Sequence, residues 1–269
     1  MLRILLNGGA QWLCRSAARC ACRAALLLVG VFLAAAPQAD ETHWRDIESR
    51  IQYGYYTEDS RALHNLEEAL EQDEAHEALR GYYAGLVAWR LALLTTQNAP
   101  AGGREAAAQL AARCVKALDG VLATQADFAE GLALRAACQE PPVAGGGLHL
   151  PFAGHSARKD IERALALAPR NPRVLLIEAA GDYQLPAAQG GNRERALVKL
   201  RQAVATFELE RGGPEPLPGW GAAEAYLFLA RDLMDHGDAV GARDALERAL
   251  LAAPDYRQAR RLMAKIAAG

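Results

Sequence analysis

The stretch "WGAAEAYLFLARDLMDHGDAVGARDALERALLAAPDY", residues 220–256, decides the fold class of this 269-residue chain. Its first half sets bulky, apolar or small residues three and four positions apart. These residues are Tyr226, Leu229, Ala230 and Leu233. Residues at this spacing share one face of a helix, so the first half predicts a helix with an apolar face.

The second half of the stretch predicts a turn and a second helix. Gly237 marks the turn, and Asp238 can cap the next helix because its carboxylate accepts backbone N–H bonds that lack a partner within the helix. The apolar face of that helix carries Ala242, Leu246 and Ala249. Pro254 ends the helix, since proline lacks the N–H and disfavours helix in the residue before it. The alanines allow the two helix backbones to approach closely.

The second-helix pattern recurs four times upstream. The residues in its three positions are Ala62, Leu66 and Ala69; Ala157, Ile161 and Ala164; Ala196, Leu200 and Ala203; and, in a poorer copy, Cys114, Leu118 and Val121. The helical periodicity also predicts a first helix before each copy, at 42–55, 77–94, 127–139 and 173–184. No stretch shows the alternating pattern of a strand.

These repeats resemble the tetratricopeptide repeat (TPR) family, strongly in the last copy and loosely over the rest of the chain beyond residue 40. Helix pairs of this family cannot bury their apolar faces alone and therefore stack into a solenoid. The resemblance implies an all-α, TPR-like α-solenoid of four to five helix pairs. A C-terminal capping helix is predicted from about Pro254 onward, with Leu262, Met263 and Ile266 on the last repeat and basic side chains facing outward.

Three inserts rich in Pro and Gly separate the two helices of consecutive pairs, at 99–105, 141–155 and 186–191. Because they fall at the same point of each pair, we expect them to project along one edge of the solenoid. Insertions in repeat proteins often mark a binding edge, although surface loops also tolerate changes in length. A further irregular stretch, 211–220, links the last two pairs.

Residues 1–39 are predicted to be a secretory signal peptide. The apolar run at 24–36 follows four arginines, and its thirteen residues are too few to span a bilayer. We expect cleavage after Ala39, which leaves 40–269 as an exported, periplasmic TPR-like helical repeat domain. The alternative is an uncleaved segment that anchors the chain to the inner membrane.

The charge of the chain argues against nucleic acid as a partner. Residues 1–39 contain four of the 30 Lys and Arg residues and none of the 32 Asp and Glu residues, so the rest of the chain is mildly acidic. Without a basic patch, such a protein binds nucleic acid and anionic membranes poorly.

Two cysteines, Cys114 and Cys138, lie beyond the predicted signal peptide. Each is twelve residues from Ala126, the centre of the turn between their helices. Equal steps from a turn place residues opposite each other in an antiparallel hairpin, so a disulfide is possible, with Cα atoms less than about 7 Å apart. The alternative is that each cysteine fills a position for a small apolar residue.

No catalytic or metal site is predicted from the sequence, and no cofactor is expected. His149 and His155 have no further ligands at a suitable spacing for a metal ion. The Gly-Gly segments lack the Gly-Lys-Ser/Thr ending of a phosphate-binding loop, and no serine lies in a nucleophile motif. The chain is therefore not expected to be an enzyme.

Large aromatic residues are the candidate contacts to a partner. They are concentrated in the first two helix pairs, and the TPR resemblance implies that first helices line a concave surface where partner peptides lie. The candidates are Tyr55, Tyr82, Trp89 and Trp220. Trp and Tyr dominate binding hot spots. The alternative is that these residues fill the core.

The leading hypothesis is an exported, non-enzymatic scaffold or adaptor that binds a protein partner through its concave face and its insert edge. The alternative is a small-molecule or transport-accessory subunit that pairs with a periplasmic solute receptor, by analogy at the level of the fold. The sequence identifies neither the partner nor the oligomeric state.

Overall fold

The computed structural model describes residues 36–73, 77–98, 103–139, 153–211 and 217–268. Residues 1–44 and 45–269 form two separate units, and helix α2 spans the boundary between them. Residues 1–35 of the predicted signal peptide lie outside the described residues. Helix α2 begins at Ala36, before the predicted cleavage point.

Helices occur in pairs along the chain. The pairs are α2 (Ala36–Tyr56) with α3 (Ser60–Gln72), α4 (Glu77–Asn98) with α5 (Arg104–Thr124), α6 (Ala129–Gln139) with α7 (Ala153–Leu167), α8 (Pro172–Gln184) with α9 (Arg193–Glu210), and α10 (Ala222–Asp235) with α11 (Ala239–Ala252). A last helix, α12 (Arg257–Ala267), follows, and the described residues contain no strand. The all-α, repeat-like fold predicted from the sequence is confirmed.

The last pair shows why the sequence folds in this way. The carboxylate of Asp238 caps α11 by accepting a hydrogen bond of 2.8 Å from the backbone N–H of Gly241. Gly237 adopts a φ of 81° in the turn, a conformation that glycine enters without steric cost. The side chains of Ala230 on α10 and Ala242 on α11 are both fully buried, as the close approach of the two helices requires.

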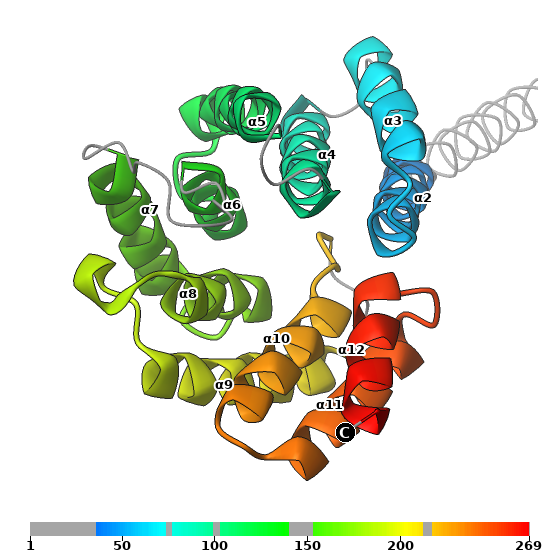
Figure 1. The fold of residues 1–269 in the computed structure, drawn as a ribbon. Coiled ribbons are helices and arrows are strands. Elements are labelled where there is room, and N and C mark those ends of the chain that lie inside the picture. Colours follow the sequence, from blue (N-terminus) through cyan, green and yellow to red (C-terminus); the bar gives the residue numbers. More distant parts are fainter. Residues whose placement is uncertain (1–35, 74–76, 99–102, 140–152, 212–216, 269) are drawn as a thin grey trace, which may run out of the picture. The chain divides into compact units, whose positions relative to one another are not determined.

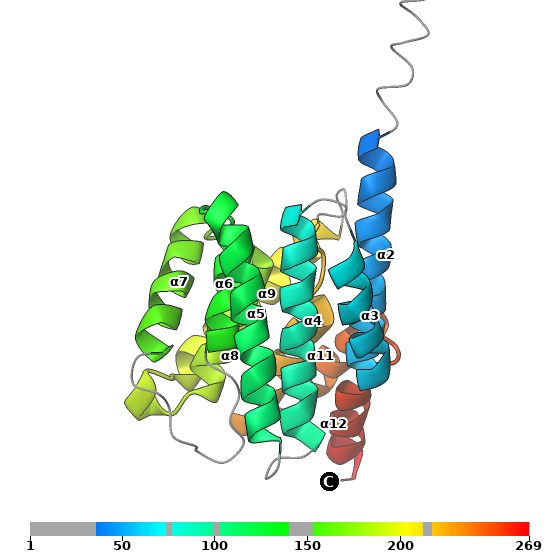
Figure 2. The ribbon, with the colours of Figure 1, turned by 90° about the horizontal axis from the view of Figure 1, so that it is seen from above.

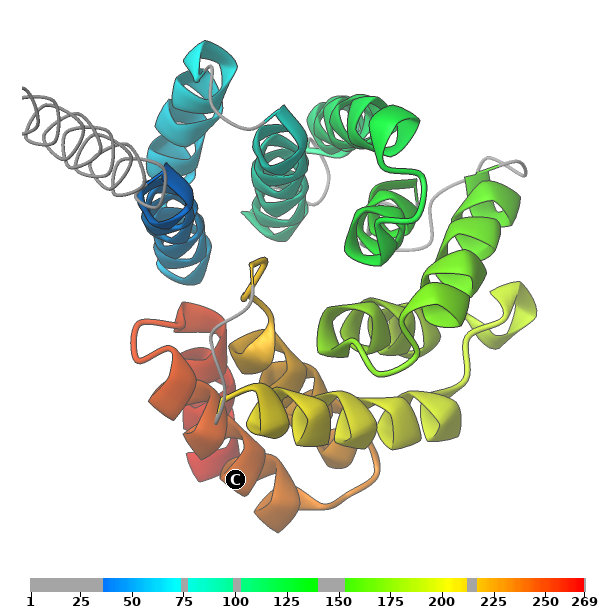
Figure 3. The same cartoon turned by 180° about the vertical axis from the view of Figure 1, so that it is seen from behind.

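From α3 to α12, successive helices pack against one another, and α4 to α7 stand side by side in Figure 2. Within residues 45–269, the early helices also meet the last ones (Figures 1 and 3). Arg261 on α12 forms an ion pair with Glu58, which lies two residues after the end of α2. Gln258 on α12 donates a 3.0 Å hydrogen bond to Gln97 on α4. The row of repeats therefore closes on itself.

Two of the three predicted inserts fall largely outside the described residues, so their common edge stays a prediction. The third insert contains the 3₁₀ helix η1 (Ala187–Gln189). Gly190 there has a φ of 97°, and a Cβ atom on Gly191 would lie 1.8 Å from the carbonyl oxygen of Leu185. This insert is thus built around two glycines and is not a loop that accepts any residue.

Candidate functional site

A buried ion pair joins the early and late helices. Arg90 on α4 and Glu224 on α10 form a salt bridge, and both residues are almost fully buried. The hydroxyl of Tyr56 donates a 2.6 Å hydrogen bond to the other oxygen of Glu224. The Arg90 guanidinium also lies 4.0 Å from the centre of the Tyr55 ring and 4.9 Å from that of Trp220.

The electrostatics of this cluster favour the charged pair. Burial alone would lower the pKa of Arg90, but the neighbouring Glu224 carboxylate raises it overall. Burial and the charge of Glu224 hold the pKa of Tyr56 well above its ordinary value. Arg90 is therefore charged at neutral pH and Tyr56 is protonated. We call this cluster the clamp, because its ion pair and hydrogen bond join α2, α4 and α10.

A second contact ties the segment before α10 to the early helices. Both carboxylate oxygens of Glu48 on α2 accept hydrogen bonds from the backbone N–H of Gly219, at 2.9 and 3.0 Å. Glu48 also accepts a 2.8 Å hydrogen bond from the hydroxyl of Tyr83. Burial raises the pKa of Glu48, and the Gly219 and Tyr83 hydrogen bonds oppose that shift. Next to it, the Trp220 indole N–H donates a 2.8 Å hydrogen bond to the Tyr82 hydroxyl.

A second buried arginine, Arg173 at the start of α8, joins three helices. Its Nε lies 2.7 Å from Glu130 on α6, and its Nη2 lies 2.9 Å from Glu210 on α9. Burial acts to lower the pKa of Arg173, but the two carboxylates raise it overall. Asn171 caps α8 and donates a 2.6 Å hydrogen bond to Glu130. The interior polar groups of this region are thus matched to one another.

The four aromatic residues predicted to contact a partner lie in or beside this interior. Tyr55, Tyr82 and Trp220 are at most 5% exposed, and Trp89 is half-buried with its ring 5.7 Å from that of Trp220. The rings of Tyr55 and Trp220 contact the Arg90 guanidinium, and the hydroxyl of Tyr82 accepts the hydrogen bond from Trp220. Contact of these residues with a partner peptide stays a prediction, and it would require the closed interior to open.

A cleft of about 540 Å³ lies beside the clamp, lined by α2, the end of α9, the segment before α10, α10 and the end of α11. We call it the α2–α11 cleft. Its lining residues are Arg45, Glu48, Ser49, Gln52, Tyr53, Tyr56, Phe207, Glu210, Arg211, Leu217, Gly219, Gly221, Ala222, Ala223, Ala252, Ala253, Pro254 and Asp255. This volume is within the range of about 300–1,000 Å³ that is usual for small-molecule sites.

Gln52, one of the residues that line the α2–α11 cleft, has a side-chain oxygen, Oε1, that is buried and accepts no hydrogen bond. This oxygen has almost no accessible surface, so the cleft itself does not reach it. By contrast, both oxygens of Glu48 and both of Glu210 are hydrogen-bonded within the protein. Buried polar atoms without partners are uncommon. An isolated glutamine in a helix forms no motif, so the sequence gives no signal for Gln52.

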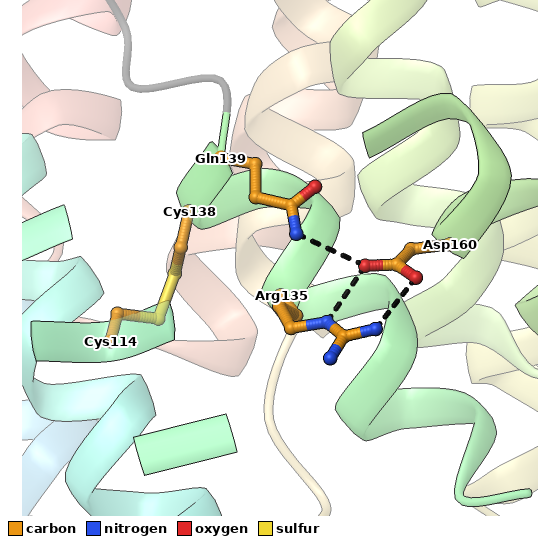
Figure 4. Close-up of a disulfide and its surroundings, with 5 residues drawn as sticks. All are labelled: Cys114, Arg135, Cys138, Gln139 and Asp160. Carbon is orange, nitrogen blue, oxygen red and sulfur yellow. Dashed lines mark hydrogen bonds and ion pairs between the residues drawn. A yellow bond between two sulfur atoms is a disulfide. The ribbon is translucent and has the colours of Figure 1, made fainter. Parts of the chain in front are cut away.

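Cys114 on α5 and Cys138 on α6 form a disulfide, with their Cα atoms 6.1 Å apart (Figure 4). The pair predicted to lie opposite about the turn is therefore within bonding reach. On the other side of α6, Arg135 makes two 2.8 Å hydrogen bonds to Asp160 on α7. Gln139 donates a third to the same carboxylate, at 3.2 Å. The disulfide and this bidentate contact tie α6 to both of its sequence neighbours.

Within the described part of the chain, no group of three or more His, Cys, Asp or Glu side chains is arranged to hold a metal ion. His149 lies outside the described residues, and His155 is exposed on α7. Among the described helices, none combines the length and apolarity needed to cross a membrane.

Comparisons with known proteins support the fold. No family model matches the sequence, and no curated protein matches it. Among solved structures, the chain is similar to "HusA haemophore from Porphyromonas gingivalis", with a TM-score of 0.55 and 18% sequence identity. The match covers 75% of this chain and 94% of that chain. At this identity the likeness concerns the helical fold alone.

Proposed function

We propose that this protein is an exported, non-enzymatic binding protein that holds a small molecule in the α2–α11 cleft. One contrast carries the proposal. The interior between the early and late helices is filled by packed side chains such as Arg90 and Glu224, whereas the cleft beside it keeps a volume of about 540 Å³. Concave, mostly apolar sites with a few polar groups are those that bind small molecules.

The fold neighbour suggests the first ligand to test. It is named a haemophore, and an iron porphyrin has a flat apolar ring with a polar edge. The α2–α11 cleft offers apolar surface from Phe207, Leu217 and alanines. Its polar groups come from α2 and from Glu210, Arg211 and Asp255. Export through residues 1–39, a periplasmic location and a TPR-type repeat remain parts of this proposal, supported by the sequence patterns described above.

A protein partner is the second candidate function, and exposed aliphatic side chains on the second helices favour it. These are Val198 and Leu209 on α9 and Val240 and Leu251 on α11, each between 65% and 80% exposed. Both helices pack against α10. This surface lies outside the closed interior, so a scaffold would bind its protein partner through α9 and α11.

Titration of the purified protein with haem, followed by the porphyrin absorption band, tests the proposed function. Ala222 lines the cleft, and a bulky side chain there occupies ligand space. We expect Ala222→Phe to weaken binding at least about tenfold, or 1.4 kcal/mol. Ala112→Phe, at an exposed position of α5 away from the cleft, is the matched control and should bind like the parent. Equal binding by both variants would place the ligand elsewhere.

A further inference from the structure

Three tyrosines that are close in the sequence of α2 have different environments. Tyr55 is buried beside Arg90, and the hydroxyl of Tyr56 donates a hydrogen bond to Glu224. Tyr53, by contrast, is 60% exposed and lines the α2–α11 cleft. Tyr53 is therefore the tyrosine of α2 whose ring and hydroxyl a ligand in the cleft can reach.

Most charged and hydroxyl groups that line the cleft already have a partner within the protein. These residues are Arg45, Glu48, Tyr56, Glu210, Arg211 and Asp255. Among the described residues, no group forms a hydrogen bond with the Tyr53 hydroxyl. A ligand can therefore bind this hydroxyl without breaking a contact inside the protein.

The chemistry of the lining residues bears on whether an iron porphyrin fits the cleft. In haem proteins the iron is bound by the side chain of a histidine, cysteine, methionine or tyrosine. The described residues that line the cleft include two tyrosines and no histidine, cysteine or methionine. The Tyr56 hydroxyl is committed to Glu224, so the oxygen of Tyr53 is the accessible iron ligand among them.

Tyr53 is also held at a fixed position by the helix. Its carbonyl oxygen accepts hydrogen bonds from the backbone N–H of Thr57, at 2.9 Å, and from the Thr57 hydroxyl, at 2.7 Å. Residues two positions away in either direction lie on the opposite face of a helix, and here those residues, Ile51 and Tyr55, are buried. Binding groups on packed helices are placed more precisely than groups on loops.

We infer that Tyr53 is the iron-binding residue of the α2–α11 cleft and that its phenolate oxygen coordinates the iron of ferric haem. The O–H bond of the phenol breaks and its proton passes to solvent, which the exposure of the side chain allows. The new Fe–O bond replaces a water ligand of the free haem, and the iron stays ferric. This inference rests on the proposed function, since it assigns an iron ligand to the same cleft.

The test compares ferric haem with protoporphyrin IX, which has the same ring without iron. Affinities of both porphyrins for the purified full chain are measured by absorption titration. Changes beyond the direct ligands commonly cost 10–100-fold in metal affinity, so loss of the ligand itself in Tyr53→Phe should weaken haem binding at least about tenfold. Binding of the iron-free ring should stay unchanged, which also shows that the variant is folded.

The absorption spectrum gives a second readout. The haem complex of the parent should show the visible charge-transfer band of a ferric tyrosinate, and Tyr53→Phe should lack it. Ser49→Ala is the matched control, because Ser49 lines the cleft one turn before Tyr53 on the same face of α2. This variant also removes a hydroxyl, and it should keep both the affinity and the band of the parent.

The contrary outcomes separate the inference from the proposed function. If Ala222→Phe weakens both porphyrins but Tyr53→Phe binds haem like the parent, the cleft holds the ligand and the role of Tyr53 is wrong. Equal weakening of both porphyrins in Tyr53→Phe would also overturn iron coordination. If neither porphyrin binds the parent, or if Ala222→Phe changes neither affinity, the cleft is not the binding site and both statements are overturned.

Discussion

Arg90 and Glu224 lie 134 positions apart in the sequence and form a buried ion pair that joins α4 to α10. The pair brings the second and fifth helix pairs together across the interior. Breaking a buried ion pair by removing one partner costs about 3–5 kcal/mol, because the remaining charge is left without compensation. The pair is therefore a sensitive point for testing whether the repeats close on themselves.

Glu224→Gln should lower the free energy of unfolding by about 3–5 kcal/mol, because it leaves the Arg90 guanidinium buried and unpaired. Urea denaturation followed by circular dichroism measures the effect. Glu247→Gln is the control, since Glu247 pairs with Arg243 on the exposed face of α11. Exposed pairs contribute about 0–1 kcal/mol. Similar costs for the two variants would mean that Arg90 and Glu224 are not buried together.

Asp232→Asn should stabilise the protein at neutral pH. Asp232 is fully buried on α10, and neither of its oxygens accepts a hydrogen bond, although the Nδ1 atom of His236 lies 3.4 Å from Oδ1. Burial raises its pKa, while the charges of His236 and Arg193 act to lower it. A carboxyl whose pKa is higher in the folded state destabilises that state as the pH rises above its unfolded pKa of about 3.9.

The gain from Asp232→Asn should therefore be about 1–3 kcal/mol at pH 7 and should vanish near pH 3, where the carboxyl is protonated in both states. Thermal melts across this pH range provide the measurement. Asp235→Asn serves as the comparison, since Asp235 is exposed and pairs with Arg193. A loss of stability in Asp232→Asn at pH 7 would contradict the prediction and show that the contact with His236 outweighs the cost of burying the carboxylate.

The disulfide between Cys114 and Cys138 should be present in protein produced in an oxidising compartment and should stabilise it. The two cysteines are 24 positions apart, and closing a loop of this length constrains the unfolded chain by roughly 3 kcal/mol. Thiol titration of denatured, non-reduced protein should find neither cysteine reactive, and the double variant with alanine should melt at a lower temperature. Two reactive thiols would contradict the bond.

Ala242→Asp should be strongly destabilising, because Ala242 is fully buried where α11 approaches α10. A carboxylate there would lack a partner, so the free energy of unfolding should fall by about 3 kcal/mol or more. A thermal melt within a degree or two of the parent would contradict the helix contact.

Gly191→Ala tests the described insert separately from the helix contacts. The new Cβ atom would lie 1.8 Å from the carbonyl oxygen of Leu185, so we expect destabilisation and a rearranged insert. Gly120→Ala on α5 is the matched control, since a Cβ atom there meets nothing within 4 Å. Alanine is the better helix former, so the control should gain about 0.5–1 kcal/mol. Equal melting temperatures of the two variants would contradict this geometry of the insert.

The sequence predicts local structure well, because each helix pair records its contacts at short spacing. Ala242, Leu246 and Ala249 lie on one helix face and meet the preceding helix, so the pattern alone identified the pair. The cysteine pair could be predicted in the same way, since Cys114 and Cys138 lie on either side of a single turn between two helices. Contacts of this kind join residues that are close in the sequence.

The closure of the repeats and the α2–α11 cleft could not be predicted in this way. The Glu58–Arg261 contact joins residues 203 positions apart, and no periodic pattern records such a pairing. The cleft exists because the end of α11 comes to lie beside α2, and Gln52 becomes unusual only once that packing leaves its oxygen buried. The aromatic candidates illustrate the same limit, since closure buries Tyr82 and Trp220.

The most direct test of the central claim is a nuclear magnetic resonance map of the backbone amides during titration with haem. We expect the largest changes at residues that line the α2–α11 cleft, including Gln52, Ala222 and Ala253. The amide signals of the insert at 186–191 should keep their positions. An absence of binding, or changes centred on that insert and not on the cleft, would contradict the account.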